Sequence, residues 1–275
     1  MHRYGILRAG ALLAMLLLML IAGAAAGHAA SVDAVWPTAS GGDVQRDGKL
    51  EVDCTNMSQG YVMVRTAESS KHAFKIKIVF GKTQLAYDLN REGDYEAFPL
   101  QLGSGKYEIA LFENVKGSKY SAEGKVKLDV KLGDENAAYL APNQYVSYEL
   151  FTSAVQKSDE LCAGATPEEC FQRVTQFITE EFAYDFVRAK TISSGALPDI
   201  DYCYDNRMGI CQDLSAVTAC MLRVQGVPSK LVIGYADKYY HAWTSSVVDG
   251  KEQFFDPTVA VGALKAKKYK IERMY

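Results

Sequence analysis

Residues 209–228 read GICQDLSAVTACMLRVQGVP and combine a helical pattern with a cysteine at its start. Apolar residues recur at steps of three and four, the period of a helix with one buried face: Leu214, Val217, Met221 and Val224. Gly226 ends the pattern. We therefore expect a helix from Cys211 to Val224. Cys211 would lie in its first turn, where the helix dipole and unpaired N–H groups favour a thiolate.

Three strands are expected after this helix. Residues 230–235 form an apolar run typical of a buried strand, and residues 241–248 and 251–256 flank Asp249-Gly250, a strong hairpin signal. If Val248 faces Lys251, Trp243 lies opposite Asp256, and His241 shares their face. His241 and Asp256 are then diagonal neighbours with about 7–8 Å between their backbones, within reach of a side-chain hydrogen bond. A slip of one residue would place them on opposite faces.

Cys211, His241 and Asp256 supply the thiol, imidazole and carboxylate that a cysteine acyl-transfer enzyme needs. Asp256 would hold one ring nitrogen of His241 and leave the other for Cys211. Each residue also has a structural interpretation. A cysteine is often a small buried hydrophobe, a histidine can be an ordinary strand residue, and an aspartate before proline commonly opens a turn. Their combination in one register favours the catalytic interpretation.

Five short segments carry a family resemblance: 183–185, 209–213, 221–228, 241–243 and 256–258. In this order and spacing they resemble the transglutaminase-like superfamily of papain-type cysteine enzymes, over roughly residues 140–260, as a bacterial-type exported member. The resemblance implies Cys211 as nucleophile, His241 as base and acid, and Asp256 as the residue that orients His241. It leaves the reaction open, because the superfamily includes cross-linking enzymes, proteases, amidases and inactive members.

Further site residues are expected around this triad. The backbone N–H of Cys211 and the side chain of Tyr204 would stabilise an oxyanion. Trp243 and Gln212 would form walls of the site, although core packing explains Trp243 equally well. No metal or cofactor is expected. The polar block around Asp201 lacks the spacing of a calcium loop, and the sequence has no Cys-x-x-Cys motif.

The N-terminus has the pattern of a signal peptide over residues 1–30. Arg3 and Arg8 precede an apolar run, and small residues follow it. The run is short for a membrane span of about 20 residues. We expect a secreted or cell-envelope protein with no stable span after cleavage, and an uncleaved anchor is the alternative. A formal charge of −3 gives no support for nucleic-acid binding. The lysine-rich residues 265–270 are expected to be a solvated tail or an edge strand.

Residues 44–132 show strand-like alternation, as in Phe74–Phe80, where apolar residues alternate with lysines. Short strands at this spacing indicate an immunoglobulin-like β-sandwich. The second domain, residues 140–275, should contain a helix that starts at Thr166-Pro167 with Glu169 reaching back. Residues 199–208 are expected to be a loop beside the nucleophile.

If Cys211 stays free as the nucleophile, five of the six cysteines remain, so at least one more is unpaired. Cys162 and Cys170 are the closest candidates for a disulfide. Cys220 is expected in the core and Cys203 in the loop before the nucleophile.

The sequence thus predicts an α+β protein with a β-sandwich before a papain-like transglutaminase core. We expect an exported cysteine acyl-transfer enzyme that acts on amides of a protein or peptide substrate, by glutamine transamidation or deamidation. A cysteine protease, or an amidase acting on a cell-envelope component, would use the same triad. A non-catalytic adhesion or scaffold protein is the remaining alternative.

Overall fold

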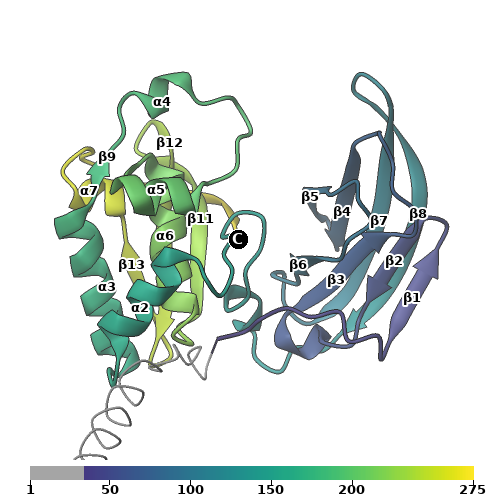
Figure 1. Ribbon diagram of the computed structural model, residues 1–275, viewed down its shortest axis with the longest axis horizontal. Coiled ribbons are helices and arrows are strands. Elements are labelled where there is room, and N and C mark those ends of the chain that lie inside the picture. Colours follow the sequence, from purple (N-terminus) through teal and green to yellow (C-terminus); the bar gives the residue numbers. More distant parts are fainter. Residues whose placement is uncertain (1–33) are drawn as a thin grey trace, which may run out of the picture. The chain divides into compact units, whose positions relative to one another are not determined.

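The computed structural model describes residues 34–275, which form one compact unit. The expected signal peptide, residues 1–30, lies outside the described residues. Within residues 34–275, no helix is long and apolar enough to cross a membrane. The expected α+β class is confirmed, because two β-sheets precede a part built from helices and a third large sheet (Figure 1).

The first two sheets are antiparallel and each has four strands. One has the order β1-β2-β3-β6, with the bounds Val44–Asp47, Leu50–Asp53, Tyr61–Thr66 and Glu96–Pro99. The other has the order β5-β4-β7-β8, with the bounds Thr83–Leu89, Phe74–Phe80, Gly105–Lys116 and Lys119–Val130. The alternation predicted for β4 is confirmed, since Ile76 and Ile78 are buried and Lys77 between them is not. Buried side chains from both sheets belong to one hydrophobic cluster.

Six helices are present in the described chain. They are α2 (Ser153–Cys162), α3 (Pro167–Glu181), α4 (Arg188–Thr191), α5 (Ile200–Asn206), α6 (Cys211–Arg223) and α7 (Pro257–Ala260). Two 3₁₀ turns cover Met57–Gln59 and Ala137–Tyr139. The helix start predicted at Thr166 is confirmed, because Thr166 and Glu169 form a reciprocal capping box. A disulfide joins Cys162 and Cys170, the pair that the sequence favoured.

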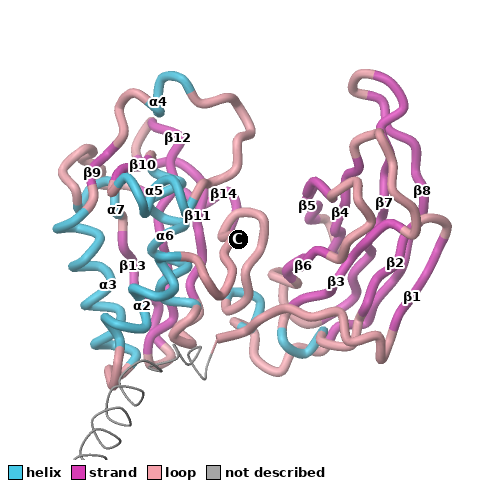
Figure 2. Tube along the Cα trace, viewed as in Figure 1, coloured by secondary structure: helices cyan, strands magenta, loops and turns pink. Residues whose placement is uncertain are grey.

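The third large sheet has the order β13-β12-β11-β14 and is antiparallel. Its strands are Lys251–Phe255, Tyr239–Val248, Ser229–Ala236 and Tyr269–Met274. Helix α6 lies alongside β11 and β12 (Figure 2). The hairpin register is as predicted, with Val248 opposite Lys251 and Thr244 opposite Phe255. β14 is an edge strand, but it contains only the last two residues of the lysine-rich segment 265–270.

The prediction of a loop over residues 199–208 is wrong. Most of it forms α5, because the Asp199 side chain accepts a hydrogen bond from the backbone N–H of Tyr202 and caps the helix. Cys203 is therefore a buried helical residue and not a loop cysteine. The mostly polar composition hid a short helix with one apolar face. The predicted division into domains 44–132 and 140–275 stays a prediction.

Candidate active site

The nucleophile candidate Cys211 is the first residue of α6, as the sequence predicted. It follows β10 (Met208–Gly209), which pairs in parallel with β9 (Ala183–Tyr184). Gly209 passes so close to its neighbours that an added Cβ would lie 2.6 Å from Sγ of Cys203 and 2.8 Å from Cβ of Asp213. Only glycine lets the chain enter the helix along this path. The path in turn fixes the position of Cys211 at the start of α6.

Asp213 holds the start of α6 in place and is fully buried. Its Oδ2 accepts hydrogen bonds from the backbone N–H of Ile210 at 3.1 Å and from Nε of Arg188 at 2.9 Å. Its Oδ1 accepts one from the backbone N–H of Asp199 at 3.1 Å. The Arg188 guanidinium thus compensates a carboxylate that burial would otherwise disfavour.

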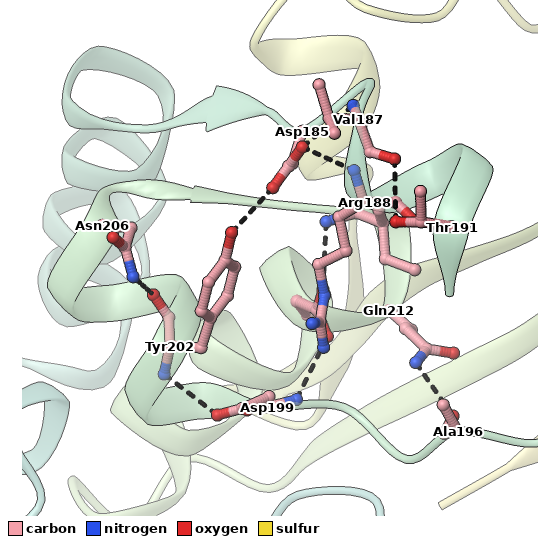
Figure 3. Close-up of polar contacts among 11 residues, drawn as sticks. Asp185, Val187, Arg188, Thr191, Ala196, Asp199, Tyr202, Asn206 and Gln212 are labelled. Carbon is pink, nitrogen blue, oxygen red and sulfur yellow. Dashed lines mark hydrogen bonds and ion pairs between the residues drawn. The ribbon is translucent and has the colours of Figure 1, made fainter. Parts of the chain in front are cut away.

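The same contacts fasten residues 185–199, here called the strap, to the first turn of α6. Figure 3 shows the polar contacts of the strap, including that of Ala196 with Gln212. Asp185 accepts from the backbone N–H of Arg188 at 2.8 Å and from the hydroxyl of Tyr202 at 2.9 Å. Gln212, expected as a site wall, donates its Nε2–H to the carbonyl of Ala196 at 3.0 Å. Gln212, which directly follows Cys211, therefore ties the strap to the first turn of α6.

His241 and Asp256 meet as the predicted register requires. His241 Nε2 lies 2.9 Å from Asp256 Oδ2, and both side chains are buried. Asp256 also caps α7, because its Oδ1 accepts from the backbone N–H groups of Thr258 at 3.0 Å and Val259 at 3.2 Å. With Nε2 occupied by Asp256, Nδ1 is the nitrogen left for the thiol.

The pKa of His241 reflects the influence of both Asp256 and Cys211. Burial by itself would lower the pKa of His241. Hydrogen bonds to Asp256 and Cys211, together with their charges, outweigh burial and raise the pKa of His241 to about 9. An imidazolium is therefore favoured over neutral imidazole near neutral pH, which is the form that pairs with a thiolate.

The remaining predicted residues lie at different distances from this chemistry. Trp243 stacks beside His241, with ring centroids 6.3 Å apart. Tyr204 is buried, with its ring 4.0 Å from the Arg207 guanidinium and 6.3 Å from the ring of Phe182. None of the contacts recorded within residues 34–275 joins Tyr204 to Cys211, so its oxyanion role stays a prediction. In the same described part, no three His, Cys, Asp or Glu side chains gather to hold a metal ion.

Sequence reasoning missed three residues at the site. Tyr269 donates its hydroxyl to Asp256 Oδ2 at 2.8 Å. Burial, and to a lesser extent the charge of Cys211, raises the pKa of Tyr184 to about 12. Arg188 was given no role. Tyr184 could have been found from the segment 183–185, whereas no local pattern marks Tyr269 or Arg188.

A buried imidazole bonded to a carboxylate, next to a cysteine at a helix start, supports a cysteine-dependent enzyme. Residues 156–257 match the family model described as the transglutaminase-like superfamily. The chain therefore carries a transglutaminase-like core, and the resemblance seen in the sequence is confirmed. Among curated proteins, none matches the chain.

Three solved structures are distantly similar. A candidate cysteine protease from Cytophaga hutchinsonii is 10% identical with a TM-score of 0.39, covering 85% of this chain and 90% of that chain. The periplasmic domain of TgpA from Pseudomonas aeruginosa, bound to ethylmercury, is 19% identical with a TM-score of 0.37, covering 82% and 78%. Red sea bream transglutaminase is 12% identical with a TM-score of 0.29, covering 72% and 48%. TM-scores this low do not by themselves indicate a function.

Proposed function

We propose that this protein is an exported cysteine acyl-transfer enzyme that acts on amides, with the glutamine side chain of a protein or peptide as acyl donor. The observation that carries the proposal is that His241 bonds to the buried Asp256, while Cys211 acts with Asp256 to raise the pKa of His241. That arrangement supports a thiolate held by an imidazolium that a buried carboxylate orients. The triad roles of Cys211, His241 and Asp256 are part of the proposal.

In the proposed reaction, the thiolate of Cys211 attacks the amide carbonyl carbon. The backbone N–H of Cys211 stabilises the oxyanion, with Tyr204 as the second donor predicted from the sequence. His241 gives its proton to the departing nitrogen, so ammonia leaves and a thioester remains. A primary amine or water then attacks the thioester. His241 takes the proton of that nucleophile, and the thiolate is restored.

The first test asks whether Cys211 is the reactive thiol. Iodoacetamide at mildly acidic pH, followed by mass spectrometry, should label Cys211 selectively. Cys54, Cys203 and Cys220 are internal controls because they are free and buried, and burial raises the pKa of each of these thiols. Equal labelling of Cys211 and the buried cysteines, or none at Cys211, would contradict a thiolate nucleophile and favour a non-catalytic scaffold.

The second test identifies the reaction. A glutamine-containing protein is incubated with and without a fluorescent primary amine, and with the Cys211→Ala variant as control. Amine incorporation or ammonia release that requires Cys211 supports transamidation or deamidation. New peptide N-termini would indicate a protease, and release of cell-wall fragments an amidase. Either of those outcomes would replace glutamine as the acyl donor.

Export is a separate part of the proposal. The supporting observation is the sequence pattern of residues 1–30, a positive segment followed by an apolar run and small residues. N-terminal sequencing of the protein from the cell envelope or the medium should find a mature chain that begins near residues 26–31. An unprocessed chain retained in the membrane would show that the segment acts as an anchor.

A further inference from the structure

Tyr269 makes a contact that the proposed triad does not include. It is the first residue of β14 and lies beyond residues 156–257, where the family match ends. Its hydroxyl donates to Asp256 Oδ2 at 2.8 Å, and His241 Nε2 bonds to that same oxygen at 2.9 Å. Two donors therefore share the oxygen through which Asp256 acts on His241.

The carboxylate of Asp256 has four hydrogen-bond partners. Oδ1 accepts from the backbone N–H groups of Thr258 and Val259, and Oδ2 accepts from His241 and Tyr269. A carboxylate offers about four acceptor positions, so Asp256 is saturated and its rotation is blocked. Because the site is buried, each partner's partial charge acts more strongly than it would in water.

Packing, and not the hydrogen bond alone, aims the Tyr269 hydroxyl. The ring meets Trp243 edge-on at 5.1 Å and Phe254 at 4.8 Å between centroids. β14 reaches this place because Gly234 has no side chain, since a Cβ there would lie 2.0 Å from the carbonyl oxygen of Lys270. The pairing of β11 with β14 also shifts register next to Gly234. The backbone thus presents the hydroxyl to Asp256 before any bond forms.

We propose that Tyr269 is a positioning residue that acts through Asp256: its hydroxyl draws charge away from Oδ2 and limits how tightly the carboxylate holds the protonated His241. The inference rests on the proposed function only in that His241 must release its proton during turnover. The hydrogen of the hydroxyl is a positive partial charge near the imidazolium, so it weakens the hold of Asp256 on that proton.

The other groups that act on this pair are few in the described part of the chain. Cys211 reaches His241 from α6. Asp237 acts on Tyr269 at longer range, and its carboxylate accepts from the backbone N–H groups of Lys267 and Lys268. Neither contacts Asp256 Oδ2 in the described contacts, so removing the Tyr269 hydroxyl isolates its effect on the carboxylate.

The test is the titration of His241 by NMR in the full chain, with its signal assigned by its loss in His241→Gln. In Tyr269→Phe the ring packing stays and the hydroxyl is gone, so the pKa of His241 should rise above that of the wild type. His72 serves as an internal control, and Tyr148→Phe removes a matched buried hydroxyl, which donates to Leu140 elsewhere in the chain. The titration of His72 should be the same in Tyr269→Phe as in the wild type, and the pKa of His241 should not change in Tyr148→Phe.

A double-mutant comparison separates action through Asp256 from direct action on His241. In an Asp256→Asn background, Tyr269→Phe should leave the His241 titration unchanged, because the charged acceptor is absent. An unchanged or lowered pKa of His241 in Tyr269→Phe alone would overturn the inference, and so would an equal rise in the Asn background. Titration needs no substrate, so these results stand apart from the alkylation and amide-release tests of the proposed function.

Discussion

At the scale of single residues, the chemistry of the site depends on the proton that His241 holds against Asp256. His241 and Asp256 are both removed from water, and such a pair is stable only when geometry and further hydrogen bonds repay desolvation. Asp256 meets that condition with its backbone donors from α7 and the hydroxyl of Tyr269. The raised pKa of His241 is the electrostatic result.

The stability of the protein should depend on this proton. The pKa of His241 rises from an ordinary value of 6.5 to about 9 on folding, so the folded state binds the proton more tightly than the unfolded chain does. The stabilisation is complete below about pH 6.5 and is lost as the pH rises towards 9. Compared with His241→Gln, the wild type should lose on the order of 2–3 kcal/mol across this range. Urea unfolding at several pH values measures it, and a constant difference would contradict the linkage.

Asp256→Asn should reduce turnover much less than Cys211→Ala does. Asparagine can still hold the ring of His241 through its amide oxygen but supplies no charge for the imidazolium. We expect a loss of about 10²-fold for Asp256→Asn, as for one impaired proton-transfer partner, and near-complete loss for Cys211→Ala. Amide-release rates on folded variants measure both. If the two variants are equally inactive, Asp256 does more than orient His241.

The ring of Trp243 packs against the rings of both His241 and Tyr269, so we expect it to shield the His241–Asp256 pair from water. Phenylalanine keeps most of the apolar area but does not cover the same surface. We expect Trp243→Phe to reduce turnover by about threefold to tenfold while the fold stays intact. Melting temperature and amide-release rate separate the two roles. Normal turnover with a lowered melting temperature would assign Trp243 to core packing.

At the scale of elements, hydrogen bonds join the start of α6 to the strap. Asp213 on α6 accepts from the strap's Arg188 and Asp199, and Gln212 holds the carbonyl of Ala196. The helix that carries Cys211 and the strap are therefore held together by hydrogen bonds. The strap also carries two exposed apolar side chains, Phe186 and Val187.

Arg188→Gln should weaken the attachment of the strap to α6, because the fully buried carboxylate of Asp213 loses its countercharge. Arg188 is partly exposed, so we expect a loss of about 1–3 kcal/mol of unfolding free energy and slower alkylation of Cys211. Lys157→Gln is the matched control, since Lys157 pairs with Glu160 in an exposed ion pair. It should change stability by less than about 0.5 kcal/mol. Equal effects of the two substitutions would show that the buried carboxylate needs no partner.

At the scale of the whole molecule, a single buried arginine joins distant parts of the chain. Arg223, at the end of α6, donates to the carbonyls of Ala141 at 2.7 Å, Ser229 at 2.8 Å and Tyr275 at 2.8 Å. The ring of Tyr275 stacks on Tyr145 with centroids 3.5 Å apart. One side chain therefore joins the segment before α2, the start of β11 and the residue that follows β14.

Arg223→Met keeps an apolar stem of similar length but takes the guanidinium donor away from three carbonyls, of which only that of Tyr275 is also bonded to the backbone N–H of Leu231 in the described contacts outside the regular strands. We expect a loss of about 3–5 kcal/mol of unfolding free energy, measured by urea denaturation. Arg91→Met is the control, since Arg91 is exposed and its side chain makes one long hydrogen bond, at 3.4 Å, in the described contacts. It should change stability by less than about 0.5 kcal/mol. A small effect of Arg223→Met would mean that water or rearranged backbone replaces the guanidinium.

The amino-acid sequence determined those features that follow from local periodicity and turn chemistry. The period of residues 211–224 predicted α6, and Asp249-Gly250 set the register that brings His241 to Asp256. The capping box at Thr166 and the alternation in β4 were predicted in the same way. In each case the residues that specify the feature are neighbours along the chain or across one short turn.

Only the tertiary structure decided the contacts between residues that no local pattern relates. Tyr269 reaches Asp256 because β14 pairs closely with β11 at Gly234, and Arg188 reaches Asp213 across 25 positions of sequence. The helix α5 also escaped prediction, since its short apolar face becomes visible only when it is packed. Such contacts depend on where whole elements dock, and docking is set by the summed packing of many side chains and not by any one segment.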